Sequence, residues 1–252
     1  MNRVAAVILA AGKGTRMGDK NGSPIPKVMF EINGVPMIRY SVKNVQAAGV
    51  DQVVLVVGYK KELVTGFFGS EVEYAIQEQQ LGTGHAVAVA KDKIKGMSEA
   101  VLVCYGDMPL FNSQTIANLI EVFNSEQPTI VLLSVDFKEP EKWAYGRIIR
   151  GMNGDVERIV EQKDCSIEEL AIKESNAGFY IFDAAWLWEN VEKINNENNQ
   201  HEYYLTDLIA LARTQGKRVM AVKMKDEHEA LGINTPEQLA LVGSILKTKV
   251  LS

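Results

Sequence analysis

The chain has 252 residues, of which 46% are apolar and 23% charged, a composition typical of a globular protein with one large domain or two small ones. The formal net charge of -5 argues against nonspecific binding to nucleic acids or membranes, because such binding uses a basic surface. Two cysteines are too few for a disulfide framework, and no segment approaches the ~20 apolar residues of a membrane span. Since the first residues also lack a signal-peptide pattern, we expect a cytoplasmic protein.

Four short, continuously apolar runs predict strands at residues 4–10, 53–57, 101–105 and 129–135. Uninterrupted runs of this kind indicate strands that are buried on both faces, as in a parallel sheet. Helical stretches are predicted between them at 36–48, 84–90 and 113–123, the last with Ser113 as its N-cap. This alternation predicts a doubly wound α/β fold, in which ligands bind at the carboxyl ends of the strands.

The pattern changes after about residue 140. Segments 146–149 and 156–160 predict a β-hairpin, because the Asn153-Gly154 pair between them is a strong turn signal. Residues 177–182 predict a further strand. We expect these strands to form a β-rich lobe that covers the substrate within one continuous domain. Thr235 is expected to cap a last helix that begins at Pro236.

The first predicted strand runs into a glycine-rich loop at residues 9–17, LAAGKGTRM. Small residues let the backbone approach a ligand, successive N–H groups can hold phosphate oxygens, and Lys13 and Arg16 add positive charge. The loop matches neither a P-loop nor G-x-G-x-x-G, so an ordinary tight turn is the alternative. Lys27 follows two prolines nearby and is either a second phosphate ligand or a solvated surface charge.

Two later loops have residue types suited to a nucleotide. Gln77 can pair with the edge of a base while Gly82 lets the ring approach the backbone, or else the loop is a polar connection with Thr83 as N-cap. Asp107 follows the third predicted strand, where a carboxylate can hold Mg²⁺ on a triphosphate or simply cap a turn.

Taken together, these segments resemble the sugar-nucleotide pyrophosphorylases, and most closely the uridyltransferase domain of bacterial bifunctional N-acetylglucosamine-1-phosphate uridyltransferases. The resemblance runs nearly from end to end, through residues 9–17, 26–28, 80–86, 105–110, 145–148, 160–164, 176–178, 202–207 and 232–234. It implies a Rossmann-like, mostly parallel sheet with a β-rich sugar-binding lobe, the nucleotide-diphospho-sugar transferase fold. It divides the single domain, 1–252, into a nucleotide-binding half (1–135), a sugar-binding half (136–234) and a C-terminal helix (235–252).

The resemblance also implies the reaction and the site. The reaction is uridylyl transfer from UTP to a sugar 1-phosphate, N-acetylglucosamine 1-phosphate in the closest enzymes, with release of pyrophosphate. The nucleotide would pack on Leu9, Ala10, Ala11, Gly12 and Gly14, its uracil on Gln77, Gly82 and Thr83, and its phosphates on the catalytic cations Arg16 and Lys27. The cofactor would be Mg²⁺ on Asp107 and Asn234. Gly146, Glu161 and Asn176 would contact the sugar, with Tyr105 and Thr206 nearby.

Three departures from the family pattern stand out. Residues 18–25 form a longer segment than expected, and His201 stands where the family usually has glycine. The chain also ends soon after the helix predicted from Pro236, so we expect no acetyltransferase domain and a stand-alone pyrophosphorylase.

Other interpretations remain open. The base or acceptor can differ, as in thymidylyl or cytidylyl transfer to another sugar or alcohol phosphate. A catalytically inactive sugar-nucleotide-binding subunit is a further alternative, although it would not need Arg16, Lys27, Asp107 and Asn234 together. We interpret the three histidines and three tryptophans as structural, with His201 the histidine best placed to reach a sugar. The sequence does not reveal the oligomeric state.

Overall fold

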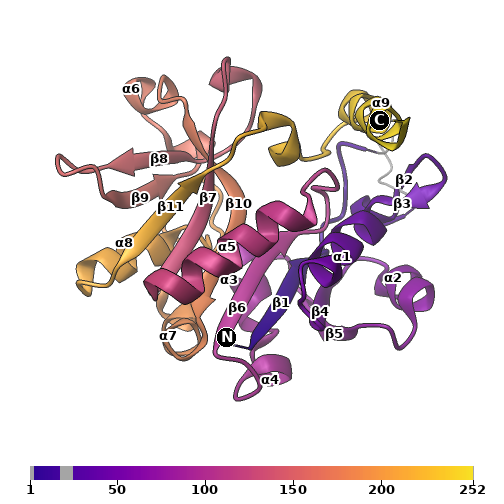
Figure 1. The fold of residues 1–252 in the computed structure, drawn as a ribbon, viewed down its shortest axis with the longest axis horizontal. Helices are drawn as coiled ribbons and strands as arrows, with labels where there is room; N and C mark the ends of the chain where they lie inside the picture. Colours follow the sequence, from indigo (N-terminus) through magenta and orange to yellow (C-terminus); the bar gives the residue numbers. More distant parts are fainter. Residues whose placement is uncertain (1–2, 18–24, 252) are drawn as a thin grey trace.

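The computed structural model describes residues 3–17 and 25–251, which fold around one large sheet (Figure 1). Within the described residues this sheet has nine strands, in the order β11-β7-β10-β6-β1-β4-β5, with β8 pairing to β10 and β9 to β8. The strand bounds are β1 Val4–Leu9, β4 Gln52–Val57, β5 Glu73–Ile76, β6 Ala100–Tyr105, β7 Ile130–Asp136, β8 Arg147–Arg150, β9 Val156–Val160, β10 Glu174–Asp183 and β11 Val219–Lys223.

The sheet is mostly parallel, as the apolar runs predict. Strands β1, β4, β5 and β6 run parallel to one another, as do β7 and β11. The exception is β10, which pairs antiparallel with both β6 and β7. The strand predicted at 177–182 is therefore part of the main sheet, and its assignment to the lobe is wrong. The eight residues between its two ends are buried, which suits the centre of a sheet covered on both faces.

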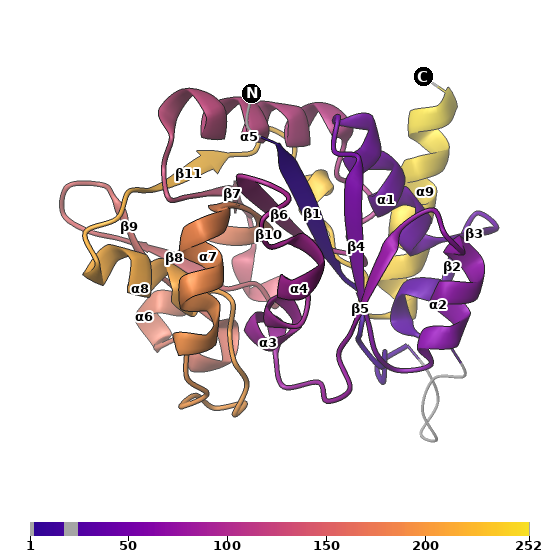
Figure 2. The same cartoon turned by 90° about the horizontal axis from the view of Figure 1, so that it is seen from below.

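Helices cover both faces of the sheet, and β1 shows why its sequence has no polar alternation. Ala6 and Ile8 pack in the cluster that includes α1 and α5, whereas Ala5 and Val7 pack in the cluster that includes α3, α7 and α8. Figure 2 shows α1 and α5 on one side of the sheet and α3 and α7 on the other. The bounds of the helices are α1 Met37–Ala47, α2 Lys61–Phe68, α3 Thr83–Ala88, α4 Lys91–Ile94, α5 Ser113–Glu126, α6 Ile167–Leu170, α7 Ala184–Asn190, α8 Asp207–Thr214 and α9 Pro236–Leu251.

Two N-cap residues predicted from the sequence can be compared with the observed first residues of α5 and α9. The prediction of Ser113 as N-cap is wrong by one residue, because the Asn112 side chain accepts the backbone N–H of Thr115 at 2.8 Å and Ser113 is the first helical residue. At α9 the Thr235 hydroxyl accepts the N–H of Gln238 at 3.3 Å, which confirms that cap.

The predicted hairpin is present as β8 and β9, which pair antiparallel around a turn with Gly154 at φ +83°. A second, two-stranded sheet, β2 Glu31–Ile32 and β3 Val35–Pro36, precedes α1. Helix α9 lies beside it, and Asn33 donates to the Gly243 carbonyl at 3.2 Å (Figure 1). Five 3-10 turns complete the described chain, at Lys27–Met29, Pro140–Lys142, Gln162–Asp164, Val191–Lys193 and Glu227–Ala230. Apart from Ile25, the longer segment noted at 18–25 lies outside the described residues.

Candidate active site

The carboxyl ends of the parallel strands bring the glycine-rich loop, the Gln77 loop and Asp107 to the same edge of the sheet. Strand β1 ends at Leu9, and its neighbours β4 and β6 end at Val57 and Tyr105. The turn after β6 is fastened to β1, since Gly106 donates its N–H to the Leu9 carbonyl at 2.9 Å. Ligands bind at this edge in open α/β sheets, so the fold itself selects the region.

The glycine turn after β1 holds Lys27 in place. Gly14 has φ +66°, and a Cβ added there would lie 2.9 Å from the Cβ of Lys27. The Lys27 N–H also points to the Gly12 carbonyl, at 3.4 Å. Any larger residue at position 14 would push the lysine away, so the glycine is needed for this close approach.

The ammonium of Lys27 lies between two oxygen-bearing side chains from distant parts of the chain. It forms an ion pair with the Asp107 carboxylate and donates to Oδ1 of Asn234 at 2.7 Å. Arg16 donates to the same Asn234 oxygen at 2.8 Å. The backbone fixes this arrangement, because Ile233 donates its N–H to the Asp107 carbonyl at 3.0 Å.

Asp107 and Asn234 are therefore a pair of hard oxygen donors turned towards one cation, which here is the lysine ammonium. Their chemistry fits Mg²⁺, which takes one or two protein oxygens and keeps several waters. The described residues contain no cluster of three or more histidine, cysteine, aspartate or glutamate side chains that could hold a metal ion by themselves. A metal at this point would share its coordination with substrate and water.

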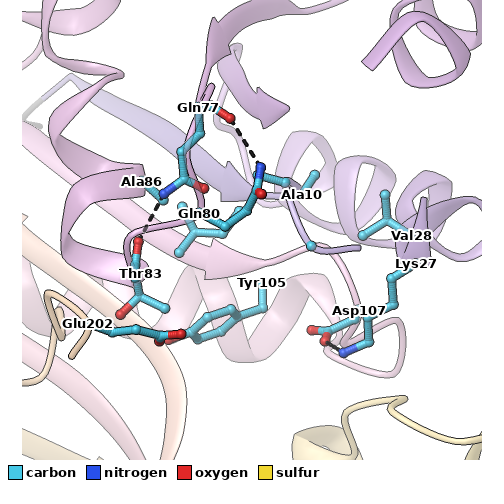
Figure 3. A pocket seen from close by; sticks show the side chains of 14 residues that line it. Ala10, Lys27, Val28, Gln77, Gln80, Thr83, Ala86, Tyr105, Asp107 and Glu202 are labelled. Carbon is cyan, nitrogen blue, oxygen red and sulfur yellow. Dashed lines mark hydrogen bonds and ion pairs between the residues drawn. The ribbon is translucent and has the colours of Figure 1, made fainter. Parts of the chain in front are cut away.

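A cavity of about 240 Å³ opens between the glycine turn and α3 (Figure 3). Gln77, which is 3% exposed, donates through Nε2 to the Gly82 carbonyl and contacts Nδ1 of His85, both at 3.0 Å. Gly82 has φ +115°, and a Cβ there would lie 2.6 Å from the Tyr203 carbonyl oxygen. The wall of this cavity is formed by Leu9, Ala10, Ala11, Gly12, Lys27, Val28, Gln77, Gln80, Gly82, Thr83, Ala86, Tyr105, Asp107 and Glu202.

Thr83 is the first residue of α3 rather than its N-cap, a position held by Gly82. Its hydroxyl instead accepts the N–H of Leu205 at 2.9 Å, and Gly84 donates to the Tyr203 carbonyl at 2.7 Å. The segment before α8 is thereby joined to the start of α3, on the wall of the cavity.

A second cavity, of about 150 Å³, adjoins the first, and Tyr105 and Asp107 line both. Its wall is formed by Tyr105, Asp107, Met108, Ala144, Tyr145, Gly146, Glu161, Asn176, Gly178, Gly232 and Asn234. Burial raises the pKa of Glu161, an effect that the Thr206 hydroxyl opposes by donating to Oε1 at 2.9 Å. A partly buried carboxylate with one oxygen bonded to Thr206 can accept hydroxyl groups of a ligand through the other.

An irregularity in β10 shapes the second cavity. The register of β10 on β7 shifts between Asn176 and Tyr180. Gly178 lies within this shift at φ +74°, where a Cβ would be 2.7 Å from the ring of Tyr105. Asn176 accepts the Gly178 N–H at 3.1 Å and donates to the Tyr180 hydroxyl. Tyr105, whose ring lies against Gly178, lines both cavities.

Most residues expected in the site line one of these cavities. Three residues are exceptions: Gly14 supports Lys27, Arg16 donates to Asn234, and Thr206 lies buried behind Glu161. Gln80, Met108 and Gly178 line the cavities although the sequence did not single them out. Each of the three lies in a segment that resembles the family, 80–86, 105–110 or 176–178, and that position could have identified them as site residues. His201 does not line either cavity of the described chain and has φ +54°, a left-handed conformation that glycine adopts without strain.

Comparison with known proteins identifies the family of the chain. A family model described as the MobA-like NTP transferase domain matches residues 6–163. "Bifunctional protein GlmU" of Acetivibrio thermocellus is 43% identical over 251 residues, covering 100% of this chain and 53% of that protein. The protein of the same name from Geotalea uraniireducens is 42% identical over 252 residues, covering 99% and 54%. The chain thus spans about half the length of these curated relatives.

Two solved structures share the fold. A UDP-glucose pyrophosphorylase complexed with UDP-glucose superposes with a TM-score of 0.78 at 20% identity, covering 99% of this chain and 100% of that one. A putative glucose-1-phosphate thymidylyltransferase from Bacillus anthracis, in complex with a sucrose, gives 0.77 at 18% identity, covering 96% and 94%. Among the described residues no helix is both long and apolar enough to cross a membrane. The family model matches more than half of the chain, and the chain therefore belongs to the MobA-like NTP transferase domain family.

Proposed function

We propose that the chain transfers the uridylyl group of UTP to N-acetylglucosamine 1-phosphate, giving a UDP-sugar and pyrophosphate. One observation carries the proposal: two adjoining cavities share Asp107 and Tyr105, and Lys27 from the wall of the first bonds both Asp107 and Asn234, which line the second. A nucleotide in the first cavity and a sugar phosphate in the second would present their phosphates to each other at this junction. Full-length similarity of the chain to part of the GlmU proteins supports this pair of substrates.

The first cavity suits a nucleoside triphosphate. Gln77, Gly82 and Thr83 would bind the base, and the backbone from Leu9 to Gly14 would lie along the ribose and phosphates. Lys27 would bind a phosphate at the inner end of the cavity. Arg16, which is exposed and already bonded to Asn234, would reach the leaving pyrophosphate from outside.

The second cavity suits the sugar. Glu161 would accept sugar hydroxyl groups, and the Asn176 amide would donate to the sugar. Gly146 lets β9 approach closely enough to place Glu161 in the wall, since a Cβ there would lie 2.8 Å from Cγ2 of Ile159. Thr206 would act through Glu161, whose Oε1 it already holds. At about 150 Å³ the cavity is of the right order for a single sugar unit rather than an oligosaccharide.

Asp107 and Asn234 would hold Mg²⁺, which when bound supplies positive charge to the phosphates of both substrates. The chain's own residues have to hold two anions together against their repulsion. A phosphate oxygen of the sugar 1-phosphate attacks the α-phosphorus of UTP, and the bond to the β-phosphate oxygen breaks. Because the nucleophile is already an anion, no protein base is needed. Lys27 and Arg16 would offset the charge that accumulates on the leaving pyrophosphate, and positioning contributes the rest.

A pyrophosphate-release assay over UTP, TTP and CTP, each with several sugar 1-phosphates and Mg²⁺, tests the proposal. We expect the highest kcat/KM for UTP with N-acetylglucosamine 1-phosphate. A preference for TTP or CTP would assign a different transferase, and absence of release from every pair would contradict an enzymatic role.

A further inference from the structure

The carboxamide of Gln77 is held on its nitrogen side by two acceptors. Nε2 donates to the Gly82 carbonyl at 3.0 Å, and the second contact, to Nδ1 of His85, is also 3.0 Å. The Gly82 carbonyl is itself fixed, because it also accepts the N–H of Ala86 at 3.1 Å in the first turn of α3. Figure 3 shows the side-chain nitrogen of Gln77 on its bond to the Gly82 carbonyl and the side-chain oxygen on the opposite side of the carboxamide.

The Gly82 carbonyl determines which way the carboxamide faces. A rotated amide would place its oxygen 3.0 Å from the Gly82 oxygen, where two acceptors repel each other. Nε2 therefore faces Gly82, and its second N–H is the one directed at His85. It follows that Nδ1 of His85 is the acceptor and that the ring proton lies on Nε2, since a neutral imidazole has one donor and one acceptor.

This arrangement leaves the oxygen of the carboxamide for the cavity. Within the described chain, the hydrogen bonds of the Gln77 side chain are made through Nε2, and Gln77 lines the first cavity. A carbonyl oxygen at a base site pairs with an N–H donor. At N3, uracil and thymine present such a donor, whereas cytosine presents an acceptor. A base that lies with N3 against this oxygen is therefore uracil or thymine, because cytosine would set two acceptors against each other.

We propose that His85 is a positioning residue that keeps the Gln77 oxygen turned to the base, so that the site accepts uracil-type bases and rejects cytosine. The inference rests on the proposed nucleotidyl transfer and adds a residue to it. Without an acceptor at position 85, only the Gly82 carbonyl holds Nε2, and the second N–H of the buried amide has no partner. Because the Gly82 carbonyl also accepts the Ala86 N–H, it stays bonded when the whole amide moves away from it and turns its nitrogen into the cavity, where solvent or a base satisfies both N–H groups. The rotated amide presents the donor that cytosine N3 pairs with.

Two variants of matched shape test the role. In His85→Asn the side-chain oxygen takes the place of Nδ1 and keeps an acceptor, whereas His85→Leu places a methyl group there. We expect His85→Leu to lower the ratio of kcat/KM for UTP over CTP by about fivefold to tenfold, the effect of one net hydrogen bond. His85→Asn should restore most of the ratio. An unchanged ratio in a folded His85→Leu variant, or equal losses in both variants, would overturn the proposal.

A second measurement needs no turnover and no change at position 85. The chain has three histidines, so the ¹⁵N shifts of the His85 ring can be assigned with His201→Gln and His228→Gln variants. We expect the tautomer protonated at Nε2, and the Nδ1-protonated tautomer would overturn the proposal. Failure of the proposed function would look different, because the wild-type protein would then release no pyrophosphate from UTP while the tautomer stayed as inferred.

Discussion

Nζ of Lys27 donates to Oδ1 of Asn234 at 2.7 Å, although 207 positions separate the two residues in the chain. The same ammonium pairs with Asp107, so a cation already lies where two oxygen donors converge. In the proposed mechanism Asp107 and Asn234 would exchange the ammonium for Mg²⁺, and Lys27 would turn to the phosphates.

Replacing Lys27 with methionine separates its two effects. In Lys27→Met we expect tighter binding of Mn²⁺, used as the probe for Mg²⁺, by roughly tenfold, because the competing charge next to the two oxygens is gone. Turnover should nevertheless fall by about 10²–10³-fold, since a charge on the phosphates is lost. Electron paramagnetic resonance of free Mn²⁺ and pyrophosphate release measure the two effects. Lys43→Met, which removes an exposed lysine of α1 outside both cavities, is the control. Unchanged Mn²⁺ affinity in Lys27→Met would argue against the exchange.

Glu161→Gln should affect the sugar substrate and spare the nucleotide. Loss of a charged acceptor costs about 1.5–3 kcal/mol, so KM for the sugar phosphate should rise roughly tenfold to a hundredfold while KM for UTP stays within about twofold. Initial rates over both substrates provide the test. Equal increases in both KM values would place Glu161 outside the sugar site.

The same residue predicts a pH effect. Because burial raises the pKa of Glu161, its carboxylate takes up a proton at a higher pH than an ordinary glutamate does. The wild-type KM for the sugar phosphate should therefore increase as the pH falls, starting above the usual range of glutamate. This rise should be missing in Glu161→Gln, and its persistence there would point to another group.

Gly82→Ala should lower the free energy of unfolding more than Gly49→Ala does. Gly82 combines φ +115° with a close approach to Tyr203, whereas Gly49 has φ +88° and no atom within 4 Å of an added Cβ. Both alanines introduce backbone strain of about 1–2 kcal/mol, and the clash at position 82 adds about 1–3 kcal/mol. Urea unfolding of Gly82→Ala and Gly49→Ala measures the difference. Equal losses would mean that the loop adjusts freely around residue 203.

Asp207→Asn should stabilise the fold at alkaline pH. Burial, together with repulsion by Asp164, raises the pKa of Asp207 to about 6 from 3.8. The Asp207 carboxyl thus loses its proton at a lower pH in the unfolded chain than in the folded protein. The free energy of unfolding therefore falls progressively as the pH rises from about 4 past 6. At pH 8 we expect Tm to be about 2–4 °C higher in Asp207→Asn, after allowing for partial exposure, with little gain at pH 4. Asp51→Asn, at an exposed position, should show neither change.

The sequence predicts the four central parallel strands closely, because their buried faces leave continuous apolar runs. It does not predict β5, in which only Ala75 is buried and polar and exposed positions interrupt the run. Nor does it predict β11, which is buried mainly at Val219. The place of β10 between β6 and β7 depends on pairing between segments far apart, which no local pattern contains.

The candidate site divides in the same way. The turn that carries Lys27 and the strand end that carries Asp107 are visible as glycine and proline signals. The contact of His85 with Gln77 is not, because eight positions and a change from loop to helix separate them. The placing of Thr206 behind Glu161 depends on the segment before α8 folding back against α3.

The central claim is that Asp107 and its neighbours bring two anions together for transfer. It is tested most directly by pyrophosphate release from UTP and N-acetylglucosamine 1-phosphate at saturating Mg²⁺, with wild-type protein, Asp107→Ala and, as a control, Asp136→Ala, which removes a carboxylate paired with Lys223. The account predicts turnover in the wild type and the control, and a loss of at least about 100-fold in Asp107→Ala with the circular dichroism spectrum unchanged. Turnover of Asp107→Ala within twofold of the wild type would contradict it.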